Sequence, residues 1–188
     1  MHPPALLVPA LLVIDVQKGL DDPVWGQRNN PQSEANIARL LAEWRDRSLS
    51  IVHMRHCSVM PHSPLRPELP GNAYKTEARP LPGEMEFTKT VNSAFIGTGL
   101  EPYLRAQGIT ALVVAGLTTD HCVSTSVRMA ANLGFEVTLV TDATATFERR
   151  GHDGTHYAAE AMHAIALASL HGEFCTVQTT EQVLRSLA

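Results

Sequence analysis

The sequence contains few cysteines and no apolar stretch long enough to span a membrane. Its three cysteines, Cys57, Cys122 and Cys175, are an odd number and lie far apart, so they form neither a disulfide framework nor the paired spacing of a zinc site. The opening run MHPPALLVPALLVIDVQ is too short for a transmembrane helix and lacks the basic residues of a secretory signal. The sequence therefore predicts a reduced, cytoplasmic protein that does not contact a membrane.

Basic residues are also too few and too scattered for nucleic-acid binding. The 15 Lys and Arg residues against 19 Asp and Glu residues leave a formal charge of -4, with no basic cluster. A chain of 188 residues suits one domain, residues 1–188. A domain of this size can bury roughly 70% of its unfolded surface without disulfides. These features predict a single domain whose partner is a small-molecule substrate.

The chain alternates between strand-like and helix-like segments. The run ALLVIDV is almost wholly apolar, which is typical of a strand buried on both faces of a parallel sheet. The other predicted strands are SIVHMRH, EFTKTV, TALVVAG, FEVTLVTDA and EFCTVQ, and the predicted helices cover residues 31–47, 98–107, 121–133, 155–170 and 179–187. This alternation predicts an α/β fold, in which one parallel sheet carries helices on both faces and the crossovers are right-handed.

One segment breaks the alternation. Residues 57–85, CSVMPHSPLRPELPGNAYKTEARPLPGEM, are too many for an ordinary connection. They are also too rich in apolar and aromatic side chains for a simple linker. We therefore predict that this proline-rich segment is a binding loop.

Three residues with useful chemistry follow predicted strands. Asp15 ends the first strand, Lys89 lies at the end of the EFTKT strand, and Cys122 comes one tight corner after TALVVAG. Ligands of open parallel sheets bind beyond the carboxyl ends of the strands, so these residues are placed for catalysis. A carboxylate, an ammonium and a thiol suffice for nucleophilic acyl transfer, and Lys89 and the helix start favour the thiolate. Individually, each also has an ordinary structural interpretation: a turn cap, a solvated charge and an inert packed thiol.

The stretches around these residues resemble a known family. LLVIDVQKG, FTKTVNSAF and VVAGLTTDHCVSTSVRMAANLGFEV are similar to the motif blocks of the isochorismatase-like cysteine hydrolases, and the similarity covers nearly the whole chain. The resemblance implies a three-layer αβα sandwich with a six-stranded parallel sheet and an Asp15–Lys89–Cys122 catalytic triad. It also implies a cis peptide bond between Leu117 and Thr118. The backbone N–H groups of Thr118 and Cys122 would then form an oxyanion hole.

This triad implies hydrolysis through a thioester. Cys122 would attack the carbonyl carbon of a small amide, ureide, carbamoyl group or lactam, Asp15 would move the protons, and Lys89 would stabilise the thiolate. No cofactor is needed. The alternative from a different class is a non-catalytic small-molecule-binding protein on the same fold.

The resemblance also bears on metals. Nicotinamidases carry an Asp-x-His metal motif after the second strand, where this chain has His56 and Ser58 in HMRHCS. A hydrolytic metal site needs about three protein ligands, so we predict no metal and metal-independent hydrolysis. A metal-dependent nicotinamidase-type amidase remains the alternative. The layout of the motifs in this chain resembles that of the small cysteine hydrolases, such as streptothricin hydrolase, more closely than that of the nicotinamidases.

Several further side chains are candidates for substrate binding because they lie in loops after strands or near the motifs. Gln17 follows Asp15 by two residues and would point the same way from a strand. Simple packing is the alternative for the aromatic residues in the set. The predicted substrate-binding residues are Gln17, Trp25, His56, Tyr74, Phe95 and Thr119.

The predicted helix within THYAAEAMHAIALASL has small residues on more than one face. Its spacing places His156, Glu160 and His163 on one face, which we interpret as a polar or subunit-facing stripe rather than a metal site. Ala158, Ala161, Ile165 and Ala168 lie on a second side. Packing against a sheet needs only one apolar stripe, so we predict a homo-oligomer, a dimer or tetramer. The alternative is an exposed face whose alanines simply favour helix.

Overall fold

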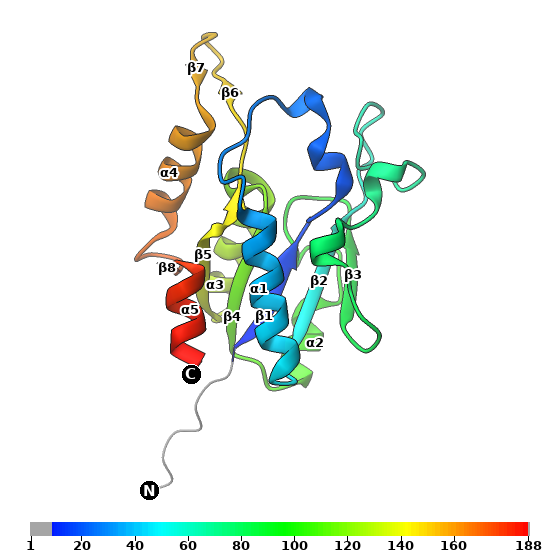
Figure 1. Ribbon diagram of the computed structural model, residues 1–188, viewed down its shortest axis with the longest axis vertical. Coiled ribbons are helices and arrows are strands. Elements are labelled where there is room, and N and C mark those ends of the chain that lie inside the picture. Colours follow the sequence, from blue (N-terminus) through cyan, green and yellow to red (C-terminus); the bar gives the residue numbers. More distant parts are fainter. Residues whose placement is uncertain (1–8, 188) are drawn as a thin grey trace, which may run out of the picture.

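The computed structural model describes residues 9–187, so the ends of the predicted domain, residues 1–8 and 188, lie outside the described part. Six strands form one parallel sheet in the order β3-β2-β1-β4-β5-β8, which confirms the predicted six-stranded parallel sheet (Figure 1). The strands are β1 (Ala10–Ile14), β2 (Ile51–His56), β3 (Met85–Lys89), β4 (Ala111–Leu117), β5 (Glu136–Ala145) and β8 (Thr176–Gln178).

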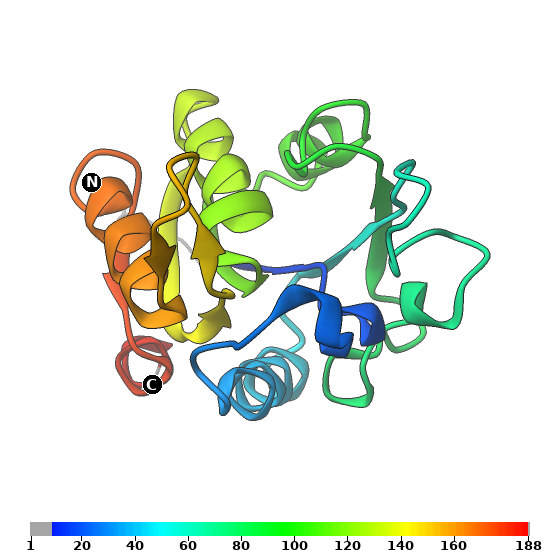
Figure 2. The same ribbon diagram turned by 90° about the horizontal axis from the view of Figure 1, so that it is seen from above.

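Helices cover both faces of the sheet, as the continuous apolar strands predict. The helices are α1 (Ser33–Asp46), α2 (Leu100–Ala106), α3 (Ser124–Asn132), α4 (Ala159–Leu170) and α5 (Thr180–Leu187). Successive β1 residues supply two cores: Leu12 packs with the residues of α2 and α3, and Leu11 packs with those of α1 and α5. Seen from above, α1 and α5 lie on one side of the sheet and α2 and α3 on the other (Figure 2). None of the helices among residues 9–187 is long and apolar enough to cross a membrane.

The strand order reverses between β1 and β4. The chain runs from β1 outward through β2 and β3, then returns to β4 on the other side of β1 and continues to β5 and β8. Gly116 allows β4 to lie close to β1, because a Cβ atom at this position would meet the Ile14 carbonyl oxygen at 2.0 Å. The sheet therefore presents its topological switch point, where ligands of open α/β sheets bind, at the carboxyl ends of β1 and β4.

The segment after β5 differs from the prediction. Residues 155–158 do not begin the helix: β6 (Arg149–Arg150) and β7 (His156–Tyr157) form a small antiparallel hairpin, and α4 starts at Ala159. His156 consequently pairs with Glu148 at 2.8 Å in the hairpin and shares no helix face with His163. The predicted stripe of His156, Glu160 and His163 is wrong. The glycine-flanked turn GHDG is the local signal that favours this hairpin.

The outer face of α4 motivates a prediction about assembly. Ala158, Ala161, Ile165 and Ala168 are exposed, with Ile165 at 60% exposure, while α4 touches α3 and the turn before it from its other side. We expect light scattering at micromolar concentration to give a multiple of 20.5 kDa. Ile165→Lys should shift that mass toward one chain, because it places a charge in the contact. Gln107→Lys, on an exposed site after α2, is the matched control. A single-chain mass for the unmodified protein would contradict association.

Candidate active site

Neighbouring strand ends bring the predicted triad together at the switch point. Lys89 is the last residue of β3 and lies in register with His56, the last residue of β2. Asp15 follows β1 directly, and Cys122 lies in the turn that follows β4. These strands are adjacent in the sheet, so parallel topology places residues separated by more than 100 positions in one cluster.

The Lys89 ammonium is the centre of this cluster. Its Nζ atom donates to Asp15 Oδ2 at 2.6 Å, to the Cys122 Sγ atom at 3.2 Å and to the Val91 carbonyl oxygen at 3.2 Å. It also lies 3.2 Å from His56 Nδ1. Burial and the nearby Lys89 charge hold the pKa of His56 below its usual range, which favours the neutral imidazole beside the ammonium.

Asp15 is buried and held in an unusual backbone conformation. Its φ of +52° lies in the left-handed region, which Asp tolerates better than most residues. The Asp15 N–H donates to the Met54 carbonyl oxygen at 2.9 Å, which fixes this turn against β2. Burial raises the pKa of the Asp15 carboxyl, and the Lys89 charge offsets this only in part. The second carboxylate oxygen, Oδ1, is buried and has no hydrogen-bond partner among the described residues, so it is free to accept a proton.

Burial favours the neutral thiol at Cys122. Burial, followed by the nearby negative charge of Asp15, raises the pKa of Cys122 to about 12, although Lys89 acts in the opposite direction. Lys89 thus acts in the predicted direction, towards the thiolate, but burial and Asp15 outweigh it. Desolvation disfavours the charged sulfur more than one ammonium, already paired with a carboxylate, stabilises it. The thiol must lose its proton during the reaction itself.

The turn that carries Cys122 is a π-helical turn, η5 (Thr119–Val123). The Leu117–Thr118 peptide bond is cis, as the resemblance implies. The Thr118 carbonyl oxygen accepts from the His121 and Val123 N–H groups at 3.1 and 3.2 Å. The buried Thr119 hydroxyl lies 2.9 Å from His163 Nδ1, so α4 ties the turn down from outside. These contacts fix the backbone immediately around the sulfur.

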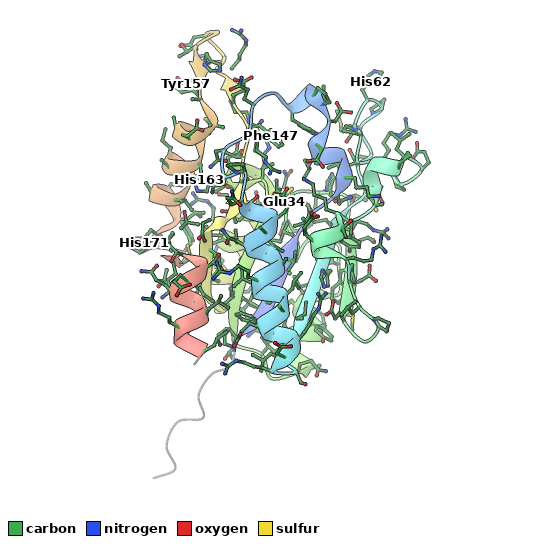
Figure 3. The ribbon with its side chains drawn as sticks, viewed as in Figure 1. Glu34, His62, Phe147, Tyr157, His163 and His171 are labelled. Carbon is green, nitrogen blue, oxygen red and sulfur yellow. The ribbon has the colours of Figure 1, made fainter. Side chains whose placement is uncertain are left out.

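A pocket of about 510 Å³ opens onto the thiol. Its walls come from the triad side, from the end of β4, from residues 20–25 and from residues 58–65 of the proline-rich loop. In that loop, Val59 and Met60 are 73% and 66% exposed. This position supports the prediction that the loop binds a ligand. Figure 3 shows His62 of the loop and Tyr157 of the hairpin at the carboxyl end of the sheet, on opposite sides of the molecule.

A larger hollow of about 1020 Å³ lies away from this cluster, with a lining that includes Pro9, Ala111 and Glu136. Pro9 is the first described residue. The lining contains none of the predicted site residues. We therefore place the candidate site in the smaller pocket, where the ionisable groups converge.

Of the predicted substrate-binding residues, Trp25 and His56 line the pocket. The Trp25 indole is fixed, because its Nε1 atom donates to the Gly19 carbonyl oxygen at 2.7 Å and its ring stacks on Phe147. His121 also lines it. Aromatic and imidazole rings thus form part of the wall around the sulfur.

The other four do not line the pocket, and their part in substrate binding stays a prediction. Gln17 is fully buried, and its amide joins β2 to the loop through bonds to the His56 and Asn72 carbonyl oxygens. Tyr74 packs against Arg55 and His53. Phe95 packs against Phe135 in the core. Thr119 points to His163, as described above.

Asn92 and Arg149 line the pocket but are not among the predicted site residues. Asn92 donates from Nδ2 to the Cys122 Sγ atom at 3.6 Å, directly after the Lys89 motif. Arg149 reaches the pocket from the hairpin and pairs with Asp120, with its Nε atom 3.1 Å from Oδ2. Val59 supplies exposed apolar surface from the loop. The only sequence signal for Asn92 is its place three residues after Lys89, and Arg149 has none.

A comparison with known proteins decides the family. The model of the Isochorismatase domain family matches residues 9–182. The chain belongs to the isochorismatase family. It is 47% identical to the isochorismatase family protein YrdC of Bacillus subtilis over 93% of this chain and 94% of that protein. The isochorismatase-family protein from Chromobacterium violaceum has a crystal structure that matches with a TM-score of 0.92 and 50% identity, over 95% of this chain and 93% of that one.

The relatives of this isochorismatase-family hydrolase that have named activities include a hydrolase and an amidohydrolase. The streptothricin hydrolase of Streptomyces noursei is 35% identical over 75% of this chain and 51% of that protein. The maleamate amidohydrolase of Pseudomonas putida is 29% identical over 96% of this chain and 88% of that protein. The chain is thus an isochorismatase-family hydrolase with amidohydrolase relatives.

Proposed function

We propose that this isochorismatase-family hydrolase cleaves a small amide, ureide, carbamoyl or lactam C–N bond through a Cys122 thioester. One observation supports this most strongly. The Lys89 ammonium contacts both the Asp15 carboxylate and the Cys122 sulfur, while Asp15 Oδ1 has no partner among the described residues. A ligand atom of Asp15 lies within 4.8 Å of the sulfur. A base, a nucleophile and a compensating charge are therefore within reach of one substrate carbon.

The proton moves with the attack. The Cys122 sulfur bonds to the carbonyl carbon as Asp15 accepts the thiol proton, so negative charge leaves the carboxylate and develops on the carbonyl oxygen. The Thr118 and Cys122 N–H groups are the proposed oxyanion donors for that oxygen. Asp15 then gives the proton to the departing nitrogen, the C–N bond breaks and a thioester remains. Throughout, Lys89 stays beside both groups that carry charge.

Water completes the cycle. Asp15 removes a proton from water, whose oxygen attacks the thioester carbon, and the sulfur leaves with its bond pair. The proton returns to the sulfur, and the free acid departs. This sequence returns a neutral thiol beside a carboxylate. The raised pKa of Cys122 favours the neutral thiol, and the raised pKa of Asp15 makes its carboxylate a stronger base.

A panel of amides, ureides, carbamates and lactams tests the proposal through ammonia or amine release. We expect one class to be hydrolysed and an acyl adduct on the Cys122 peptide to be trapped by rapid acid quenching and mass spectrometry. A panel without turnover or adduct would favour the non-catalytic binding protein. Turnover with an adduct on another residue would contradict the assignment of Cys122.

The pH profile distinguishes this mechanism from one that starts with a thiolate. Activity requires the Asp15 carboxylate, so kcat/KM should fall as the pH falls through the pKa of Asp15, which burial raises above its ordinary 3.8. No second rise should occur near pH 8 to 9, the range of an ordinary thiol of about 8.5. Steady-state kinetics from pH 4 to 9.5 on the best amide measure this profile. A single rise centred at pH 8 to 9 would contradict the assignment of Asp15 as the base.

Metal-independent hydrolysis stays a prediction. Asp15, His56 and Cys122 offer ligand atoms within 4.8 Å of one another, but the Lys89 ammonium contacts all three and occupies the place of a cation. Ser58, the other position of the nicotinamidase motif, accepts from the Met60 N–H instead. Dialysis against EDTA should leave kcat unchanged. Loss of activity that zinc or manganese restores would favour the nicotinamidase-type alternative.

A further inference from the structure

The charges at the pocket cancel in pairs. Asp15 and Lys89 form one buried pair at 2.6 Å. Arg149 forms the other, with Nε and Nη2 at 3.1 and 3.4 Å from the two Asp120 oxygens. Asp120 is held in turn by the Thr146 hydroxyl. Among residues 9–187, no lysine or arginine that lines this pocket lacks an acidic partner.

Arg149 is not readily available to a ligand. Its guanidinium spans both oxygens of Asp120, whose side chain is only 8% exposed. If Arg149 turned toward a substrate carboxylate, Asp120 would keep a buried negative charge without its cation. Breaking one partner out of such a pair is strongly unfavourable, so the existing pair competes with the ligand.

The remaining wall is mainly apolar. The loop contributes Val59, Met60 and Leu65, and Leu20 and Leu117 lie on other sides. Asn92 is the neutral polar group nearest the sulfur, at 3.6 Å. A carboxylate would therefore find neutral donors such as Asn92 but, in the described part of the chain, no lysine or arginine free of an acidic partner. Neutral donors offset the desolvation of an uncharged polar group more completely than that of a full negative charge.

We infer that this site selects uncharged amides with a compact, partly apolar body and discriminates against amides that carry a carboxylate. The inference rests on the proposed function, which it deepens by naming the substrate class. It implies that this chain hydrolyses an anionic amide such as maleamate, the substrate named for one relative, poorly. Asp120 acts as the specificity determinant, because it neutralises the arginine that a carboxylate would need.

Two nearly isosteric amides test the selection. Glutaramide carries a terminal amide where glutaramate carries a terminal carboxylate. Ammonia release measures the hydrolysis of both. The assay is run at about pH 8, because an imidazole of ordinary pKa is neutral at this pH. We expect kcat/KM per amide group to be at least about tenfold higher for glutaramide. Equal values, or a preference for glutaramate, would overturn the inference.

The variant Asp120→Asn separates charge from shape. It keeps the side-chain size but releases the Arg149 charge, so the glutaramide to glutaramate ratio should fall toward one. The ratio is independent of how much of the variant folds. Asp153→Asn, in the exposed hairpin turn, changes the net charge equally and should leave the ratio as it is. An unchanged ratio in Asp120→Asn would overturn the role of Asp120.

Alkylation of the thiol gives a readout without turnover. Iodoacetamide and iodoacetate also differ by an amide against a carboxylate. In each case the Cys122 S–C bond forms, the C–I bond breaks, iodide leaves with the bond pair and Asp15 takes the thiol proton. We compare the two rates at Cys122, by peptide mass spectrometry, with those of a small neutral thiol in the same solution. The preference for iodoacetamide over iodoacetate should be at least about tenfold larger at Cys122 than at the small thiol. In Asp120→Asn this preference at Cys122 should decrease.

The two readouts keep the inference and the proposed function apart. Equal relative alkylation rates would overturn the charge selection, whether or not amides are hydrolysed. Selective alkylation without hydrolysis of any amide would support the selection and contradict the hydrolase. The absence of both alkylation and hydrolysis would contradict the reactive thiol and, with it, the inference.

Discussion

Replacing Cys122 by alanine lowers kcat for amide hydrolysis by at least about 10³-fold, because the bond-forming atom is lost. The same change removes one sulfur from a site that is not part of the fully buried core, so the fold should persist. Cys122→Ser should also lose activity, since a hydroxyl is a far poorer nucleophile beside a carboxylate of this basicity. Steady-state ammonia release and circular dichroism measure the two effects.

The matched control is Cys175→Ala. Cys175 is buried in the core beside the β8 end of the sheet, away from the pocket lining, so its loss should cost some stability and leave kcat unchanged. Full activity in Cys122→Ala would contradict the thioester mechanism. Loss of activity in both variants would point to a shared folding defect instead.

Replacing Lys89 by methionine destabilises the protein at alkaline pH by about 3 kcal/mol and abolishes hydrolysis. Lys89 and Asp15 are both buried, and the change leaves a carboxylate without its cation. In this variant the pKa of Asp15 rises further above its unfolded value, because burial is no longer opposed. The folded state then binds the proton more tightly than the unfolded state. Its stability is therefore greatest below about pH 4, the unfolded value, and is lost as the pH rises.

Urea unfolding at pH 5 and pH 8 tests this prediction. The deficit of Lys89→Met relative to the unmodified protein should be larger at pH 8. The double variant Asp15→Asn with Lys89→Met removes both charges and should show a smaller deficit with little pH dependence. Lys18→Met changes an exposed lysine three residues after Asp15 and should leave the free energy of unfolding unchanged. Equal stability of Lys89→Met and the unmodified protein at pH 8 would show that the pair contributes nothing.

Much of the site can be predicted from sequence because its chemistry lies at strand ends. A strand buried on both faces must be apolar throughout, so ALLVI and ALVVAGL are recognisable and the polar residue after each stands out. Parallel strands then bring Asp15, Lys89 and Cys122 to one edge. The hairpin at residues 149–157 has only its GHDG turn as a sequence signal, because its strands have two residues each and carry no periodicity.

The sequence by itself predicted the sheet, the family motifs and the three proposed reacting groups, because each depends on residues close together along the chain. Only the tertiary structure decided that burial raises the pKa of the Cys122 thiol, that Gln17 and Tyr74 do not line the pocket and that Arg149 is paired with Asp120. Burial and charge pairing arise from segments distant in sequence. A lysine at a strand end is visible in one sequence, whereas the desolvation that outweighs its charge is visible only when the surrounding elements have packed.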